Sequence, residues 1–301
     1  MLSQTQKLFF TLILSIISVT AFGQSVTAVE DSPVTCFGGS DGQATATPTG
    51  GTGPYTIFWD NGETTATATN LDAGPHDVTI EESLGATATT TVTITEATEI
   101  TSIVVMDSQV TCKGLSDGIA TVTANGGTPP YSFSWDQSTS TSSIANDLIA
   151  GFHTITITDA NGCVDLAFIT ITEPDELVAD AVELSPVVCN GEANGSAEVT
   201  VLGGTPPYTY SWDQSPSNTA TANDLIAGSH TVTIEDANNC TTTATVSITE
   251  PVELTATGAE ISPVNCWGGN DGVATVTPVG GTIPYTYMWD QSGSTSETAS
   301  D

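Results

Sequence analysis

The sequence predicts an all-β protein made of tandem immunoglobulin-like β-sandwich repeats of about 77 residues each. The first indication is a stretch that begins Gly-Gly-Thr-Pro-Pro-Tyr and ends Trp-Asp, found at residues 126–136 and 203–213, with looser copies at 50–60 and 280–290. The second is its spacing, because its tryptophans recur every 76 or 77 residues, as Trp59, Trp135, Trp212 and Trp289. A fixed period of this length indicates one folded module repeated in tandem.

The third indication is the alternation of apolar and polar residues within each repeat, which is typical of β-strands. In the second repeat the alternating positions are Ala120, Val122 and Ala124; Tyr131, Phe133 and Trp135; His153, Ile155 and Ile157; and Ile169 and Ile171. Turn-forming Asp, Asn and Gly residues separate these runs, and no window shows a sustained helical period. About seven short strands per repeat favour a sandwich in which each of these Trp residues belongs to the core.

The repeat also sets the domain boundaries. We expect a signal peptide at 1–23, then unit 1 at 24–97, unit 2 at 98–174, unit 3 at 175–251 and a truncated unit 4 at 252–301. The short joins read Thr-Glu-Ala or Thr-Glu-Pro, so the units should form a semi-rigid rod. Asp301 aligns with Asp147, in the middle of a unit, which predicts that the chain is a fragment of a longer product.

The N-terminus and the charge predict an extracellular protein. Lys7, an apolar run and the small residues Ala21 and Gly23 match a secretion signal. No other apolar run is long enough to insert into a membrane after the signal is removed. The chain has 35 acidic and only two basic residues, for a net charge of -33. Such a chain does not neutralise phosphates, so nucleic-acid binding is excluded as a function.

Six cysteines lie at two positions of the repeat. Cys36, Cys112, Cys189 and Cys266 share the first position, and Cys163 and Cys240 share the second. Disulfides are the default in a secreted chain, and the spacing does not suit a zinc site. Two schemes stay open: pairing within a unit, Cys112 with Cys163 and Cys189 with Cys240, or pairing across a join, Cys163 with Cys189 and Cys240 with Cys266. The first leaves fewer unpaired thiols and is favoured.

No residue pattern predicts catalysis or a cofactor. His76, His153 and His230 are spaced one per unit without a second ligand beside them, so we interpret them as half-buried strand residues. Two Gly-x-Ser-x-Gly runs, at 38–42 and 114–118, lack the helix that a nucleophile elbow needs. Weak Ca²⁺ binding by acidic turn residues is an alternative to a purely structural role for Asp117, Asp159, Asp236 and Asp271.

One tryptophan differs from the others. Trp267 follows the first-position cysteine of unit 4, where the other units have Phe37, Lys113 and Asn190. A position that varies this much in a turn is exposed, so Trp267 is the candidate contact residue.

The repeat resembles the SprB repeat family. The resemblance rests on Cys-x-Gly-x-x-Asp-Gly-x-Ala, on Gly-Gly-Thr-Pro-Pro-Tyr-x-x-x-Trp, on Leu-x-Ala-Gly-x-His-x-Val-Thr-Ile-x-Asp and on the closing Ile-Thr-Glu-Pro. It differs in having His after Ala-Gly, where such repeats often have Tyr, and in having Ala86 where unit 1 would carry its second cysteine. The resemblance implies a large repetitive cell-surface protein of gliding bacteria, some of which are mobile adhesins exported by the type IX route.

We therefore expect a non-enzymatic adhesin stalk on the outer cell surface. Its partners would be extracellular polysaccharides or other surface ligands, bound through many weak contacts. Two alternatives stay open: passive spacer repeats of a larger secreted enzyme, and an array of carbohydrate-binding modules.

Overall fold

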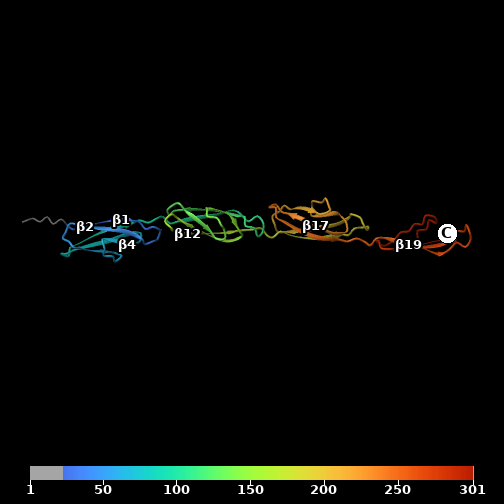
Figure 1. Ribbon diagram of the computed structural model, residues 1–301, viewed down its shortest axis with the longest axis horizontal. Coiled ribbons are helices and arrows are strands. Elements are labelled where there is room, and N and C mark those ends of the chain that lie inside the picture. The colour runs from blue at the N-terminus through green and yellow to red at the C-terminus, as the bar shows by residue number, and fades with distance from the viewer. Residues whose placement is uncertain (1–22, 301) are drawn as a thin grey trace, which may run out of the picture.

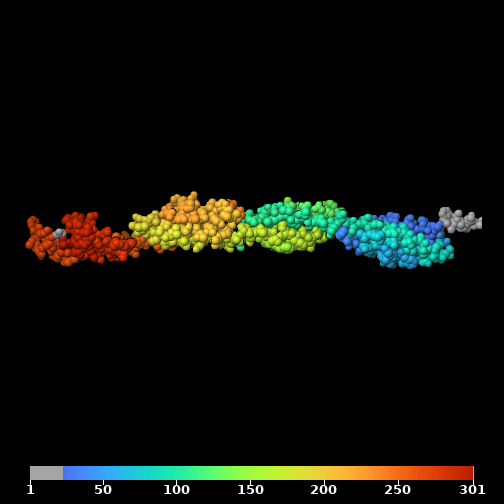
Figure 2. All heavy atoms as spheres, turned by 180° about the vertical axis from the view of Figure 1, so that it is seen from behind, coloured from blue at the N-terminus to red at the C-terminus, as the bar shows by residue number. Residues whose placement is uncertain are grey.

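The protein is a row of four repeat units, of which the first three are β-sandwiches and the fourth is a single sheet in the described residues. The computed structural model describes residues 23–300. The units follow one another along a single axis, from blue to red in Figure 1, and the space-filling view in Figure 2 shows them as a thin rod. The predicted signal peptide, apart from Gly23, lies outside the described residues.

Each complete unit contains six strands rather than the seven expected. Unit 1 consists of β1 (Ser25–Ser32), β2 (Gly42–Thr49), β3 (Tyr55–Trp59), β4 (Thr67–Leu71), β5 (Gly74–Glu82) and β6 (Thr87–Ile94). Unit 2 consists of β7 (Thr101–Ser108), β8 (Gly118–Asn125), β9 (Ser132–Trp135), β10 (Ile144–Leu148), β11 (Gly151–Thr158) and β12 (Val164–Ile171). Unit 3 consists of β13 (Val178–Ser185), β14 (Gly195–Leu202), β15 (Thr209–Trp212), β16 (Thr221–Leu225), β17 (Gly228–Glu235) and β18 (Thr241–Ile248).

The strands of a complete unit form two three-stranded antiparallel sheets. In unit 1 the orders are β1-β2-β4 and β3-β5-β6, and units 2 and 3 repeat them. The first and last strands lie side by side at one edge of the sandwich, β1 beside β6 and β7 beside β12. The tandem immunoglobulin-like sandwich that the sequence predicted is therefore confirmed.

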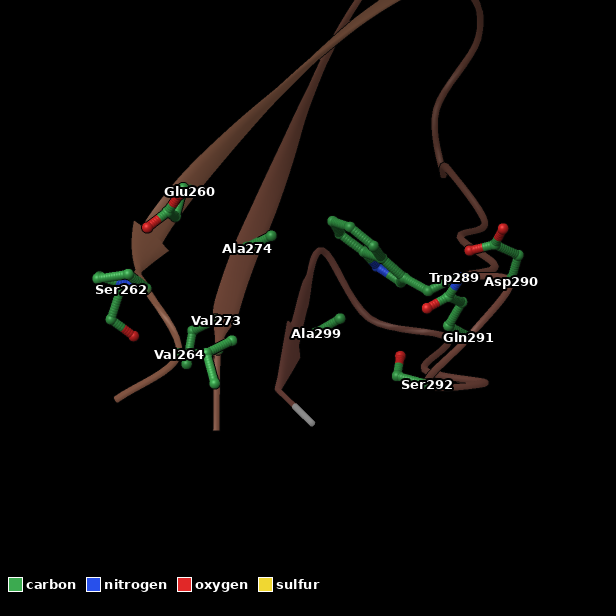
Figure 3. A pocket seen from close by; sticks show the side chains of 12 residues that line it. Glu260, Ser262, Val264, Val273, Ala274, Trp289, Asp290, Gln291, Ser292 and Ala299 are labelled. Atoms are coloured by element: carbon green, nitrogen blue, oxygen red, sulfur yellow. The ribbon is translucent and has the colours of Figure 1, made fainter. Parts of the chain in front are cut away.

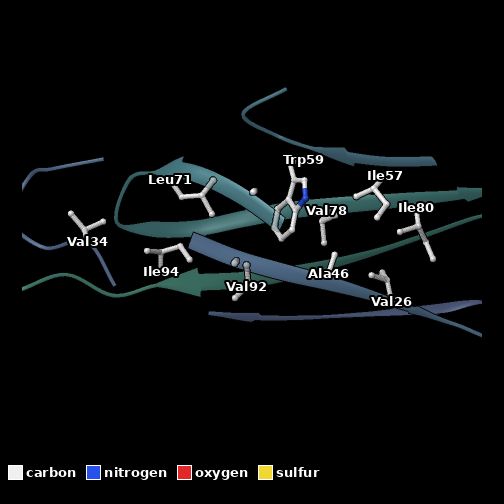
Figure 4. Packing of buried hydrophobic residues seen from close by; sticks show 12 residues of the cluster. Val26, Val34, Ala46, Ile57, Trp59, Leu71, Val78, Ile80, Val92 and Ile94 are labelled. Carbon is white, nitrogen blue, oxygen red and sulfur yellow. The ribbon is translucent and has the colours of Figure 1, made fainter. Parts of the chain in front are cut away.

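The alternating residues of the sequence form the core. Figure 4 shows Trp59 packed between the sheets of unit 1 against Val78 and Leu71. Trp135 and Trp212 are buried in the same way in units 2 and 3. In each unit the indole Nε1 donates to a carbonyl of the following loop at 3.0 Å, as Trp135 does to Ser142. The core role of these three tryptophans is thus confirmed.

Unit 4 corrects the expectation for the fourth tryptophan. It contains β19 (Thr255–Ser262), β20 (Val273–Val279) and β21 (Thr298–Ser300), which form a single sheet. Trp289 keeps the hydrogen bond to a loop carbonyl but is only half-buried. It faces Ala274 and Ala299 across an open hollow of about 410 Å³ (Figure 3). Because no second sheet covers this side within residues 252–300, the prediction that Trp289 is a core residue was wrong for the described structure.

The repeated Gly-Gly-Thr stretch forms a turn against the start of its own unit. Gly126 has φ of 80°, and a Cβ there would lie 1.9 Å from the carbonyl oxygen of Glu99. Gly127 donates its N–H to Thr98 at 2.8 Å, and the Tyr131 hydroxyl donates to the carbonyl of Gly126. Only glycine fits so close to another backbone segment. The stretch therefore fixes the beginning of the unit as well as feeding the aromatic strand.

Candidate functional site at the seams between units

The most distinctive chemistry of the chain lies at the seams, which are the short joins between units at residues 95–97, 172–174 and 249–251. Disulfides connect Cys36 to Cys163 and Cys112 to Cys240, with Cα–Cα distances of 5.6 and 5.8 Å. Each bond joins the first-position cysteine of one unit to the second-position cysteine of the next unit.

Both predicted pairing schemes were therefore wrong. Cys112 does not pair with Cys163 because the two cysteines lie at opposite ends of the same sandwich. The first-position turn lies at the C-terminal end of its unit, where Val34 pairs with Glu96 of the seam. The second-position turn lies at the N-terminal end and faces the preceding unit. Cys163 consequently meets Cys36 rather than Cys189, and Cys240 meets Cys112 rather than Cys266 or Cys189.

The closing Thr-Glu-Pro stretch holds the first-position turn. Glu96 accepts a hydrogen bond from the backbone N–H of Gly38 at 2.7 Å, and Glu173 accepts one from Gly114 at 2.7 Å. Glu250 does the same for Gly191 at 2.8 Å. These carboxylates fix the loops that carry Cys36, Cys112 and Cys189. The sequence conveys the motif but not this role, because the two residues of each contact lie almost a whole unit apart.

An aspartate holds the second-position turn. The carboxylate of Asp159 accepts backbone N–H groups from Thr128 at 2.8 Å and from Asn161 and Cys163 at 2.9 Å. Burial raises the pKa of the Asp159 carboxyl, but these donors outweigh burial and hold the pKa below its ordinary value. The same carboxylate thus connects the Gly-Gly-Thr turn to the disulfide.

Asp236 repeats this arrangement in unit 3, where it accepts N–H groups from Thr205, Asn238 and Cys240. There the side chain of Asn238 also crosses the seam and donates to the carbonyl of Thr111 at 2.9 Å. The seam between units 2 and 3 is therefore held by a covalent bond and a hydrogen bond.

The four aspartates proposed as weak calcium ligands bind their own turns. Asp117 accepts hydrogen bonds from the hydroxyl and N–H of Thr111, and these lower the pKa of its carboxyl. Asp271 accepts from the backbone and side chain of Asn265. Among residues 23–300 no cluster of three acidic, His or Cys side chains has the geometry to hold a metal ion. The structure thus gives these carboxylates a structural role, and calcium dependence stays a prediction.

The three histidines are more deeply buried than the half-buried positions expected. His153 lies with Nε2 2.9 Å from the carbonyl of Ile149 and Nδ1 3.3 Å from the Asp136 carboxylate, and Asp136 belongs to the Trp-Asp pair of the repeated stretch. In unit 1, burial lowers the pKa of His76, but the hydrogen bond that its ring donates to the Asp60 carboxylate, together with Asp72, outweighs burial and leaves the pKa raised. Each histidine therefore joins two loops of its own unit.

Two cysteines and one tryptophan lie on the surface. Cys189 and Cys266 are exposed and bond no partner within the described part of the chain. Trp267 is fully exposed, at 105% of its reference area, which confirms its predicted exposure. Its counterpart Phe37 lines a cavity of about 430 Å³ at the first seam, beside Cys36 and Cys163. A contact role for Trp267 stays a prediction.

The surface also carries a feature that the sequence reasoning missed. The outer side of β12 presents Val164, Leu166 and Phe168, and β11 adds Phe152 beside them; all four are more than half exposed. The rings of Phe152 and Phe168 stack with centroids 5.6 Å apart. An alignment of the repeats indicates that this side of β12 is exposed, because units 1 and 3 have threonine at the positions of Val164, Leu166 and Phe168.

Comparison with known proteins identifies the repeat. The family model described as the SprB repeat matches four times, at residues 29–64, 108–140, 181–217 and 258–294. The chain therefore belongs to the SprB repeat family. A search of curated proteins found no match.

Solved structures of tandem-domain proteins show a general likeness. The N-terminal eight Ig domains of Down Syndrome Cell Adhesion Molecule are 12% identical, with a TM-score of 0.33, over 87% of this chain and 40% of that chain. Three N-terminal domains of the bacteriophage RB49 Highly Immunogenic Outer Capsid protein are 16% identical, with a TM-score of 0.32, over 75% and 98%. Invasin, a bacterial integrin-binding protein, is 14% identical, with a TM-score of 0.31, over 88% and 72%. TM-scores this low carry no functional argument.

Proposed function

We propose that this protein is a non-enzymatic, adhesin-like stalk on the outer cell surface. The repeats extend the chain away from the cell and present the same scaffold several times, so that weak contacts add up through avidity. Membership in the SprB repeat family and the end-to-end arrangement of the units support this function. Within the described residues no helix is long and apolar enough to cross a membrane.

The observation that carries the proposal is the disulfide across each of the first two seams. A polypeptide join alone leaves two domains free to rotate about it. A second covalent link between the facing ends removes most of that freedom. The two bonds span sequence separations of 127 and 128 residues, so each limits how far the chain between its cysteines can extend if a unit unfolds. Such a limit suits a stalk that is pulled.

The charge supports an exposed, extended role. With 35 acidic residues and two basic ones, neighbouring chains repel one another, and neither nucleic acids nor anionic lipid surfaces are suitable partners. Extracellular polysaccharides and other uncharged surface ligands are the partners that we propose.

The adhesive function is tested with fluorescent beads that carry residues 24–301, attached through the N-terminus. We expect them to adhere to bacterial lawns or polysaccharide-coated glass more strongly than beads that carry an unrelated acidic protein. Equal adhesion of both kinds of bead to every surface would refute the proposal. The resemblance also implies a role in gliding, which a deletion strain tests through the rate of colony spreading on agar.

A further inference from the structure

The outer face of the sheet β12-β11-β9 in unit 2 differs from the rest of this acidic chain. Its ten outward positions carry no charged residue: Ser132, Ser134, Phe152, Thr154, Thr156, Thr158, Val164, Leu166, Phe168 and Thr170. At the matching positions unit 1 has Asp77 and Glu81, and unit 3 has Glu235. An uncharged apolar patch on a chain with a net charge of -33 marks a contact surface.

The face consists of two parallel stripes. On β12 the apolar stripe is Val164, Leu166 and Phe168, exposed by 59, 51 and 56%. On β11 the register places Thr158, Thr156 and Thr154 directly beside these three residues, which forms a stripe of hydroxyl groups. Phe152, 60% exposed, extends the apolar stripe by stacking on Phe168.

We infer that this face binds an uncharged polysaccharide chain that lies along β12. Its apolar row and its threonine row together form the unit 2 stripe. A pyranose ring has an apolar face of C–H groups and hydroxyl groups around its edge, so it matches an aromatic and aliphatic stripe beside a row of threonine hydroxyls. From Val164 to Phe168 the strand rises about 14 Å, roughly the length of a trisaccharide. This inference rests on the proposed adhesive function and names its ligand class and its site.

The seam cavity continues the stripe. Val164 lines both the unit 2 stripe and the cavity of about 430 Å³, whose other walls include Phe37, Glu99 and Asp165. A volume of this size is typical of sites for small ligands. The Glu99 and Asp165 carboxylates would repel an anionic sugar, which favours a neutral one.

Other occupants fit less well. A second copy of the chain brings a net charge of -33 against the same charge, with only two basic residues to compensate. A stable protein partner buries roughly 800 Å² on each side. The apolar part of the stripe consists of four side chains, and the faces of units 1 and 3 that flank it are threonine-rich and acidic.

Affinity electrophoresis tests the inference with residues 24–301 in native gels that contain dextran, laminarin or hydroxyethylcellulose, with alginate as the anionic comparison. The stripe variant is Leu166→Thr with Phe168→Thr, which installs the residues that units 1 and 3 already carry and so preserves the fold. The control is Phe58→Thr, an exposed phenylalanine of unit 1. The reciprocal variant, Thr243→Leu with Thr245→Phe, builds a second stripe on unit 3.

We expect at least one neutral polysaccharide to retard the wild type and the control, and alginate to leave both unchanged. The stripe variant should lose at least tenfold in affinity, and the reciprocal variant should be retarded more than the wild type. The inference is overturned if no neutral polysaccharide retards the wild type, or if the stripe variant is retarded as strongly as the wild type. Bead adhesion that survives in the stripe variant would overturn the inference but leave the proposed function standing, whereas no adhesion by wild-type beads would overturn the proposed function itself.

Discussion

The two inter-unit disulfides should shorten the fully unfolded chain together by much less than the sum of their separate effects. The perturbation is removal of Cys36–Cys163, of Cys112–Cys240, or of both, by paired Cys→Ser substitutions. Cys189 and Cys266 are replaced by Ser throughout so that no exposed thiol exchanges with the bonds.

The magnitude follows from the shortest covalent path between residues 24 and 300. With both bonds present, this path runs forward to Cys36, across to Cys163, back to Cys112, across to Cys240 and on to the end. The unfolded chain then extends to about 430 Å. Removal of either bond alone lengthens it to about 520 Å, and removal of both lengthens it to about 970 Å.

The assay is single-molecule force spectroscopy with handles at the two ends, in which the final contour length is measured after all units have unfolded. The matched comparison is the doubly bonded protein before and after reduction. Pairing of Cys112 with Cys163 in this background would instead give about 790 Å before reduction. A contour length near that value, or a gain from the double removal that equals the sum of the two single gains, would refute the crossed connection described above.

The remaining predictions concern single side chains. Gly126→Ala should lower the free energy of unfolding of unit 2 by about 3 kcal/mol or more, because the new Cβ would overlap the Glu99 carbonyl. Gly162 also has positive φ, but a Cβ there meets no atom within 4 Å, so Gly162→Ala should cost only about 1 kcal/mol. Equal losses for the two variants in urea titrations would contradict this reasoning. Trp135→Ala should lower the free energy of unfolding by about 3–5 kcal/mol, whereas Trp289→Ala should lower it by less than about 1 kcal/mol because the Trp289 side chain faces an open hollow. A similar loss for both variants would show that Trp289 is buried in solution. The pKa of Asp159 is lowered in the folded state, so the stability that its carboxylate gives unit 2 is complete above the ordinary value of 3.8 and is lost as the pH falls through the folded value. Asp159→Asn should therefore weaken the acid dependence of unit 2 stability. An unchanged acid dependence would contradict a stabilising role for this carboxylate. The pKa of His76 is raised in the folded state, so its effect on stability runs the other way: the stability that it gives unit 1 is complete below pH 6.5 and is lost as the pH rises through the folded value. Unit 1 should therefore lose stability as the pH rises above 6.5, and His76→Gln should remove this loss.

The sequence predicts the repeat and the core of the three complete units. Trp59, Trp135 and Trp212 alternate in phase with other apolar residues, and a period-two pattern assigns them to one face of a strand. The Gly-Gly-Thr turn was also predictable as a turn. Its close approach to the Glu99 backbone was not, because that contact depends on how the chain enters the unit.

The disulfide pairing could not be read from spacing. Separation along the chain does not reveal which end of a sandwich a turn occupies, and both cysteine positions lie in turns. The contacts of Glu96 and Asp159 fix those ends, and each contact joins residues that are far apart in sequence. The half-exposed Trp289 has a similar cause, since burial of one sheet depends on the sheet that covers it.

The unit 2 stripe was missed for a different reason. The three β12 residues Val164, Leu166 and Phe168 alternate in the sequence, just as core residues do. Only the threonines at the same positions of units 1 and 3 show that this face is solvent-exposed. Comparison of the repeats position by position would have found it.

Peptide mapping of the unreduced protein tests the central claim most directly. Residues 24–301 are secreted into an oxidising medium, digested at glutamate and aspartate residues, and analysed by mass spectrometry before and after reduction. The account predicts two cross-linked peptide pairs, one containing Cys36 and Cys163 and the other Cys112 and Cys240. Peptides that link Cys112 to Cys163 and Cys189 to Cys240 would contradict it, because each unit would then be closed on itself and the seams would have no covalent bond beyond the chain.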